Sequence, residues 1–331
     1  MAEVEAEYEK DGPKAEVLWA ALSAYVRRIN ADMNAALKTP ALRDLLGAQG
    51  AEPAGGADLQ QCRNVEERHG QDRHLLRQRH NAGMTNWVLV TGSSRGIGAA
   101  TGAAVVLDVH TGEVLAMANY PTFNPNLYRE FKEIARRNRA IQDLYEPGST
   151  FKIVTAGAAL ENKLIAPDTM VETSPGKIRF GSRVIDEDKH HNYGVLSFTD
   201  VIVKSSNVGA IKIGFGVGAA RMERYVRRFG FGQTALKRQL SGESAGDVGA
   251  LKDMTESALA SMSMGYEVSV TPLQMVTAMS AVANGGTLYE PHLVRAVVQG
   301  GARRAVAPKA VRQAITPETA ATITTIMVFV M

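Results

Sequence analysis

Two serine–lysine pairs in the chain have the spacing that nucleophilic catalysis requires. They are Ser149-Thr150-Phe151-Lys152 and Ser174-Pro175-Gly176-Lys177. On a helix, residues three apart lie on successive turns of one face, so the lysine amine can take the proton of the serine hydroxyl. Acyl transfer is the expected reaction class, because an activated serine oxygen attacks carbonyl carbons. A lone match would be weak evidence, since chance alone gives about one in a chain of this composition.

The residues around each pair distinguish the two. Pro175-Gly176 stands between the second serine and its lysine, and this dipeptide interrupts a helix. Pro147-Gly148 instead forms a turn before Ser149, and the residues that follow are suited to a helix. Ser149 would then lie at a helix N-terminus, where the dipole favours the negative charge that develops on its oxygen. The sequence therefore favours Ser149 and Lys152.

A glycine-rich segment suggests a competing chemistry. Thr91-Gly92-Ser93-Ser94-Arg95-Gly96-Ile97-Gly98 follows a strand-like run and resembles the dinucleotide-binding turn of short-chain dehydrogenases. Tyr128 and Lys132 have the spacing of that family's Tyr-x-x-x-Lys pair. A crossover helix needs a dozen or more residues, but the next strand pattern begins at Ala103. The segment at 87–98 is therefore interpreted as incidental, and an NAD(P)-binding dehydrogenase is a disfavoured alternative.

Composition excludes several other classes. The 331 residues are 45% hydrophobic and 21% charged, as in globular proteins, and a net charge of +3 is too small to indicate nucleic-acid binding. The single cysteine, Cys62, excludes an internal disulfide and a multi-cysteine zinc site. Residues 61–83 are rich in arginine, but His69, His74 and His80 are not spaced to share one helical face. We expect this stretch to be solvated and irregular, without a metal.

From about residue 99 the sequence has the pattern of an α+β domain. Two short apolar runs joined by His110-Thr111-Gly112 predict a β-hairpin. Thr271-Pro272 predicts a helix start and Asn284-Gly285 its end, while Thr316-Pro317-Glu318 predicts another start. Strands followed by many helices favour the α+β class over alternating βαβ units.

The N-terminal third has a different character. Residues 1–46 contain an amphipathic helical pattern from Pro13 to Leu37, whereas residues 47–101 combine a linker, the basic stretch and the glycine-rich segment. No basic region precedes an apolar run at the N-terminus, and nowhere do about 18 mostly apolar residues follow one another. We therefore expect neither a signal peptide nor a transmembrane segment in this chain.

Further segments give the Ser149 region a family context. Tyr145-Glu146-Pro147-Gly148-Ser149-Thr150-Phe151-Lys152 resembles the active-site segment of class B penicillin-binding proteins, the peptidoglycan transpeptidases, and Lys204-Ser205-Ser206-Asn207 resembles their Ser-x-Asn motif. Other similar segments are 115–126, 242–246 and 263–275. The resemblance covers residues 102–326, is greatest to division-type members, and does not extend to residues 327–331. It implies a serine transpeptidase or β-lactamase-like fold, with an antiparallel sheet flanked by helices.

The resemblance implies roles for four residues. Ser149 would be the acylated nucleophile and Lys152 its activator; Ser205 would relay a proton with Lys152, and Asn207 would bind the substrate amide. The implied substrates are peptidoglycan stem peptides, attacked at the penultimate D-Ala carbonyl, and β-lactams, with no metal or organic cofactor. Relatives are anchored in the inner membrane with this domain outside, and division proteins are implied partners. Membrane association here would need a segment absent from the chain.

The third motif of the family, Lys-Thr/Ser-Gly, does not occur after Asn207. The similar triplet His110-Thr111-Gly112 precedes the nucleophile and belongs to the expected hairpin turn. The corresponding strand would supply a cation for the substrate carboxylate and one oxyanion-hole amide, and loss of one such donor slows reactions about a hundred- to a thousandfold. We expect a domain truncated before this motif, with apolar helix faces exposed. A catalytically dead fragment is therefore the main alternative.

Overall fold

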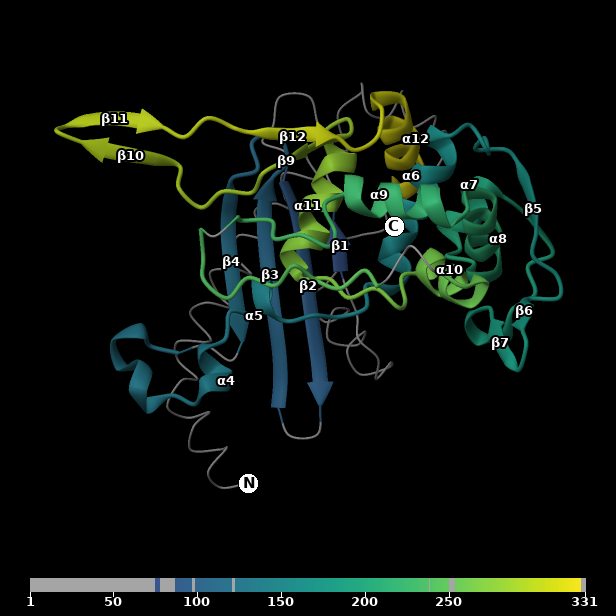
Figure 1. The fold of residues 1–331 in the computed structure, drawn as a ribbon, viewed down its shortest axis with the longest axis horizontal. Helices are drawn as coiled ribbons and strands as arrows, with labels where there is room; N and C mark the ends of the chain where they lie inside the picture. Colours follow the sequence, from purple (N-terminus) through teal and green to yellow (C-terminus); the bar gives the residue numbers. More distant parts are fainter. Residues whose placement is uncertain are drawn as a thin grey trace, which may run out of the picture. The chain divides into compact units, whose positions relative to one another are not determined.

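A computed structural model of the chain describes residues 75–77, 87–96, 99–120, 123–237, 239–249 and 254–328 (Figure 1). The chain divides into two units, Met1–His69 and Gly70–Met331, and every described residue belongs to the second. The expected helical region 1–46 lies outside the described residues, as do the positions weighed for a metal site, Cys62, His69, His74 and His80. The domain boundaries expected from the sequence stay predictions.

The main sheet has four antiparallel strands in the order β1-β2-β3-β4. The strands are β1 (Leu75–Arg77), β2 (Trp87–Gly96), β3 (Ala99–Asp108) and β4 (Val114–Tyr120). β3 and β4 form the predicted hairpin around Gly112. Gly112 has φ +77°, and an added Cβ would lie 2.6 Å from the carbonyl oxygen of Glu290. The turn therefore requires glycine.

The glycine-rich segment is a strand rather than a dinucleotide-binding turn. It lies in β2, which pairs antiparallel with β3 from Trp87 to Gly96, and β3 begins at Ala99. A Rossmann unit would instead place a helix and then a parallel strand after the last glycine. Tyr128, in the short helix η1 (Pro125–Glu130), is 45% exposed. The interpretation of the dehydrogenase-like segment as incidental is confirmed.

The expectation of an irregular stretch from 61 to 83 is wrong at Leu75–Arg77. These residues form β1 and pair with Leu89–Thr91 of β2. Their sequence, Leu-Leu-Arg, is a short apolar run inside an otherwise polar stretch. Pairing with β2 therefore determines the strand conformation of these residues despite the polar sequence around them, since β-structure depends strongly on its neighbours.

Helix α11 covers one face of the sheet, where it contacts β2 and β3 (Figure 1). It spans Pro272–Ala283 and is buried along its whole length. Thr271 and Gln274 form a capping box at its start, and Asn284 ends it, as predicted. The expectation of exposed apolar faces on the sheet-covering helices is wrong for α11, because strands β2, β3 and β9 (Thr287–Tyr289) and helix α12 (Pro317–Val328) pack against it.

A second group of helices carries the candidate catalytic residues. Its members are η2 (Gly148–Phe151), α6 (Lys152–Glu161), α7 (Phe198–Val203), α8 (Asn207–Val217), α9 (Ala219–Arg228) and α10 (Glu256–Met264). α6 contacts α8 and α9, and α8 contacts α10. Large side chains of this core, including Phe151, Phe198, Met222 and Phe229, are fully buried. Each such side chain contributes about 1.5–3 kcal/mol through burial.

The remaining elements are short, apart from α12 (Pro317–Val328), which begins after Thr316 as predicted and packs on α6 and α11. The short helices are α4 (Glu133–Arg136), α5 (Arg139–Gln142) and η3 (Asp188–His190). The paired strands are β5 (Met170–Glu172) with β8 (Val195–Ser197), β6 (Lys177–Phe180) with β7 (Arg183–Asp186), β9 (Thr287–Tyr289) with β12 (Ala310–Gln313), and β10 (Ala296–Gln299) with β11 (Ala302–Ala305). The predicted α+β class is confirmed.

In the part of the chain that the structure describes, we find no helix with the length and apolar character of a transmembrane span.

Candidate active site

Ser149 lies at the start of a continuous helical segment. η2 begins at Gly148 and passes directly into α6 at Lys152, so Ser149 and Lys152 occupy successive turns. Gly148 has φ +56°, a conformation that favours glycine. Ser149 is exposed to solvent. The helix N-terminus predicted for Ser149 is therefore confirmed.

The turn before Ser149 is held by the segment that follows α10. The Gly148 amide donates to the carbonyl of Gly265 at 3.0 Å, and Tyr145 and Val270 exchange two backbone hydrogen bonds of 3.1 and 2.9 Å. Gly265 is the left-handed C-cap of α10, with φ +89°. An added Cβ there would lie 2.0 Å from the Gly148 carbonyl oxygen. A side chain at Gly265 would therefore displace the turn that places Ser149.

Lys152 is 2% exposed and bonds to the Ser-x-Asn segment. Its Nζ donates to the carbonyl oxygen of Ser205 at 2.6 Å, to Ser205 Oγ at 3.0 Å and to Asn207 Oδ1 at 3.0 Å. Burial lowers the pKa of Lys152 to about 7, although the carboxylates of Glu187 and Asp188 act to raise it. Near neutral pH a substantial fraction of Lys152 is therefore uncharged and able to act as a base.

The three contacts of Lys152 give its neighbours distinct proton roles. Only the ammonium form has three N–H donors, whereas the neutral amine has two N–H groups and one lone pair. The carbonyl oxygen of Ser205 and Oδ1 of Asn207 can only accept. Of these three contacts, Ser205 Oγ is the one that can reverse and donate to the amine. Ser205 can therefore exchange a proton with Lys152.

The Ser-x-Asn segment lies where α7 is followed by α8. Ser205 stands between the two helices with φ +55°, a strained conformation for a residue with a Cβ. Asn207 is the first residue of α8, and its Nδ2 donates to the carbonyl of Asp186 at 3.1 Å while Oδ1 accepts from Lys152. The structure thus brings Ser205 and Asn207 to Lys152, one turn along the helix from Ser149.

Sequence reasoning does not single out Glu187, which follows β7 and whose side chain contacts the start of α8. Its carboxylate is 3% exposed and accepts hydrogen bonds from Ser206 Oγ, Asn207 N and Val208 N. The available sequence signal is the acidic run Asp186-Glu187-Asp188 after a strand-like segment. Which of its three carboxylates turns inward depends on the fold.

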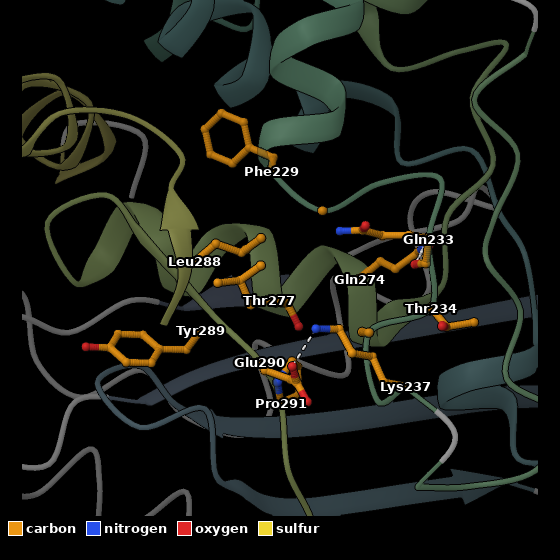
Figure 2. Close-up of a pocket in the computed structure, with 13 residues that line it drawn as sticks. Phe229, Gln233, Thr234, Lys237, Gln274, Thr277, Leu288, Tyr289, Glu290 and Pro291 are labelled. Atoms are coloured by element: carbon orange, nitrogen blue, oxygen red, sulfur yellow. Dashed lines mark hydrogen bonds and ion pairs between the residues drawn. The ribbon is translucent and has the colours of Figure 1, made fainter. Parts of the chain in front are cut away.

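Figure 2 shows a pocket elsewhere in the molecule. It is lined by residues at the end of α9, on α11 and on β9, and it contains the ion pair between Lys237 and Glu290. Ser149, Lys152 and Asn207 are not among its lining residues. The pocket is therefore separate from the candidate active site.

Comparison with known proteins identifies a family. Residues 102–331 match the family described as penicillin binding protein transpeptidase domain. Penicillin-binding protein PbpB of Mycolicibacterium smegmatis is 36% identical over 234 residues, which cover 68% of this chain and 35% of PbpB. Peptidoglycan D,D-transpeptidase FtsI of Escherichia coli is 36% identical over 193 residues, which cover 58% of this chain and 32% of FtsI. The chain thus spans about a third of the length of these relatives.

Solved structures agree with this result. Penicillin-binding protein 3 of Mycobacterium tuberculosis, complexed with aztreonam, has a TM-score of 0.59 and 36% identity, covering 68% of this chain and 50% of that chain. The transpeptidase domain of Burkholderia pseudomallei penicillin-binding protein 3 has a TM-score of 0.58 and 32% identity. The match covers 69% of this chain and 62% of that chain. Because the family match extends over more than half of the sequence, the chain belongs to the class B penicillin-binding protein transpeptidases.

Proposed function

We propose that this chain carries out the acyl-transfer chemistry of a peptidoglycan D,D-transpeptidase, with Ser149 as the acylated nucleophile. The observation that carries the proposal is the environment of Lys152. This lysine lies one turn after Ser149, its pKa is lowered by burial to about 7, and Ser205 and Asn207 hold its Nζ. The arrangement supplies a base and a proton relay beside an exposed hydroxyl.

The first half-reaction uses three side chains. Neutral Lys152 takes the Ser149 proton as Oγ bonds to the penultimate D-Ala carbonyl carbon of a stem peptide. The C–N bond then breaks, and Ser205 gives its hydroxyl proton to the leaving D-Ala amine while Lys152 returns a proton to Ser205 Oγ. Lys152 is neutral again and Ser149 is acylated. The N-terminal end of the η2–α6 segment favours the negative charge formed in the tetrahedral intermediate.

The second half-reaction reverses these proton transfers. An amine of a neighbouring peptidoglycan strand attacks the acyl carbon, its proton passes through Ser205 to Lys152, and Lys152 returns a proton to the departing Ser149 oxygen. The Asn207 amide would hydrogen-bond the substrate amide and orient it. β-Lactams would acylate the same serine, and the solved complex of a relative with aztreonam supports this.

We also propose a division-type role, with the domain outside the inner membrane and division proteins as partners. The support is similarity to PbpB and FtsI. A fluorescent fusion to the encoding gene, expressed in its own cells, should then concentrate at the septum. Uniform labelling of the lateral wall would contradict the division-type role.

Labelling with a fluorescent penicillin tests the proposed function. The folded 331-residue chain should carry a stable adduct, and mass spectrometry of a digest should place it on the peptide that contains Ser149. Ser149→Ala should lose the adduct. Ser174→Ala, at the other exposed serine three residues before a lysine, should keep it. Labelling that survives Ser149→Ala would exclude Ser149 as the nucleophile.

A catalytically dead binding fragment is the second candidate. The sequence from Asn207 to Met331 contains no Lys-Thr/Ser-Gly triplet, the motif that resemblance assigns to substrate-carboxylate binding. This candidate predicts no penicillin adduct on protein whose circular dichroism shows a folded domain. A stable adduct on Ser149 would exclude it.

A further inference from the structure

The Glu187 carboxylate connects three successive residues at the start of α8. Oε1 accepts from Ser206 Oγ and from the Val208 amide at 3.3 Å, and Oε2 accepts from the Asn207 amide at 2.6 Å. These residues are the N-cap and the first two positions of the helix, where amides have no acceptor within the helix. The Glu187 carboxylate therefore accepts hydrogen bonds from the residue before Asn207, from Asn207 itself and from the residue after it.

Glu187 is itself held in place on several sides. Its amide donates to the Gly176 carbonyl at 2.9 Å, and the carbonyl of the preceding Asp186 accepts from Asn207 Nδ2. Burial of a carboxylate at 3% exposure is costly unless it is hydrogen-bonded and balanced by a positive charge. The helix N-terminus supplies part of that balance, and Lys152, whose pKa Glu187 acts to raise, supplies a second part.

We propose, building on the transpeptidase function above, that Glu187 is a positioning residue for the Ser205–Asn207 segment that binds Lys152 Nζ. By fixing the first turn of α8, it holds Ser205 Oγ and Asn207 Oδ1 where both contact Lys152 Nζ. Its negative charge favours the ammonium that forms when Lys152 takes the Ser149 proton. Glu187 acts through these neighbours rather than on the substrate.

Two carboxylates from one segment act on the charge of Lys152. Glu187 and, on η3, Asp188 are the carboxylates that act on it. At the end of α7, Lys204 has its Nζ 5.8 Å from the centroid of the Tyr193 ring, and burial and these two carboxylates raise the pKa of Tyr193. Removal of the Glu187 charge leaves Asp188 in place. We therefore expect a partial downward shift of the Lys152 pKa.

Glu187→Gln is the most direct test, because it removes the charge at nearly constant shape. The amide accepts at only one end, so its NH₂ group would face a backbone donor of α8. Penicillin acylation should slow about tenfold to a hundredfold through lost positioning. The acidic limb of the pH–rate profile should also move to lower pH, which a purely structural role would not cause. A folded Glu187→Gln variant with the wild-type acylation rate and an unmoved acidic limb would overturn the proposal.

Glu161→Gln is a matched control. The Glu161 carboxylate accepts from the amide and the hydroxyl of Thr316 and so anchors the start of α12, as Glu187 anchors α8. This variant should lose stability but keep the acylation rate and pH profile of the folded protein. If Glu161→Gln moved the pH limb as Glu187→Gln does, the effect would be general destabilisation and the proposal would fail.

Two further variants keep the test decisive if Glu187→Gln does not fold. Glu187→Asp keeps the charge but shortens the side chain, so the rate should fall about tenfold while the pH limb stays in place. Ser206→Ala removes one donor to Glu187 and should slow acylation a few-fold, also without moving the limb. Unchanged rates in both folded variants would exclude the positioning role.

A lysine NMR titration of the full chain separates this proposal from the proposed function. The Lys152 Cε signal, identified by its loss in Lys152→Met, should titrate near pH 7 in the wild type and at lower pH in Glu187→Gln. This result does not depend on whether Ser149 reacts. Absence of labelling with the shift present would overturn the transpeptidase function alone. Labelling without the shift would overturn the Glu187 proposal alone.

Discussion

The two serine–lysine pairs of this chain share one pattern and have opposite environments. Ser149 and Lys152 lie on successive turns of one helical segment, and Lys152 is 2% exposed. Ser174 and Lys177 are both exposed, and Lys177 begins strand β6. Gly176 between them has φ +78°, which excludes a helical path from the serine to the lysine.

The difference shows that the Ser-x-x-Lys spacing alone is not sufficient. The lysine can act as a base near neutral pH only where the fold also buries it. Burial lowers the pKa of Lys152 to about 7, and three hydrogen bonds fix its Nζ against the Ser-x-Asn segment. Lys177 lies in a two-stranded pair, β6 with β7, that provides no comparable enclosure. The proposed chemistry therefore uses the first pair alone.

The largest expected effect is on the rate of acylation when Lys152 is replaced, with the same replacement of Lys177 as the comparison. Lys152→Met should slow penicillin acylation about a hundred- to ten-thousandfold, because it removes the general base. Methionine fits a buried site, so the variant should stay folded. Lys177→Met should keep the wild-type rate. Second-order acylation rate constants measured with a chromogenic β-lactam check both, and equal losses in the two variants would remove the distinction between the pairs.

Glycine substitutions beside each pair test how tightly the fold holds it. Gly265→Ala adds a Cβ 2.0 Å from the Gly148 carbonyl oxygen at φ +89°, so we expect a loss of about 2–4 kcal/mol and slower acylation of the folded protein. Gly181 lies between β6 and β7 with φ +58° and open space around it. Gly181→Ala should cost about 1 kcal/mol and leave acylation unchanged. Urea denaturation and acylation rates measure the two effects, and slower acylation in Gly181→Ala would contradict this view.

The elements that the sequence predicts are those with local signals. The hairpin turn at Gly112, the capping box at Thr271 and the helix start at Thr316 each depend on a few adjacent residues. The Ser149–Lys152 pair is local in the same sense, since one helical turn joins its members. Their contact with Ser205 is not local, and only the resemblance to a family predicts it.

The features that the sequence could not reveal depend on contacts between distant segments. Glu187 differs from its acidic neighbours only because it faces the start of α8, and Gly265 matters because the end of α10 meets the Gly148 turn. The covering of α11 likewise depends on strand β2, which the sequence pattern places outside the domain. Burial and partners at these positions follow from tertiary packing, which periodicity does not encode.

The pH dependence of acylation gives a smaller but sharper test. Burial lowers the pKa of Lys152, so the neutral base is present near pH 7 and its fraction falls about tenfold for each pH unit below the pKa. The rate should therefore rise with pH up to about 7 and then level off. Lys177→Met should show the same profile. A limb near pH 10, the range of a solvated lysine, would contradict the role of burial.

The smallest expected effect concerns two carboxylates that each accept a backbone hydrogen bond near a serine. Glu146 accepts from the Glu267 amide at 2.8 Å and so helps to hold the turn before Ser149, whereas Glu172 accepts from the Ser174 amide at 2.7 Å. Glu146→Gln should slow acylation only a few-fold, because an amide oxygen can still accept this hydrogen bond. Glu172→Gln should leave the rate unchanged, since the proposed chemistry does not use the Ser174 pair. Rate constants for the two variants, measured side by side, check this; a slower rate in Glu172→Gln alone would show that the second pair influences the first.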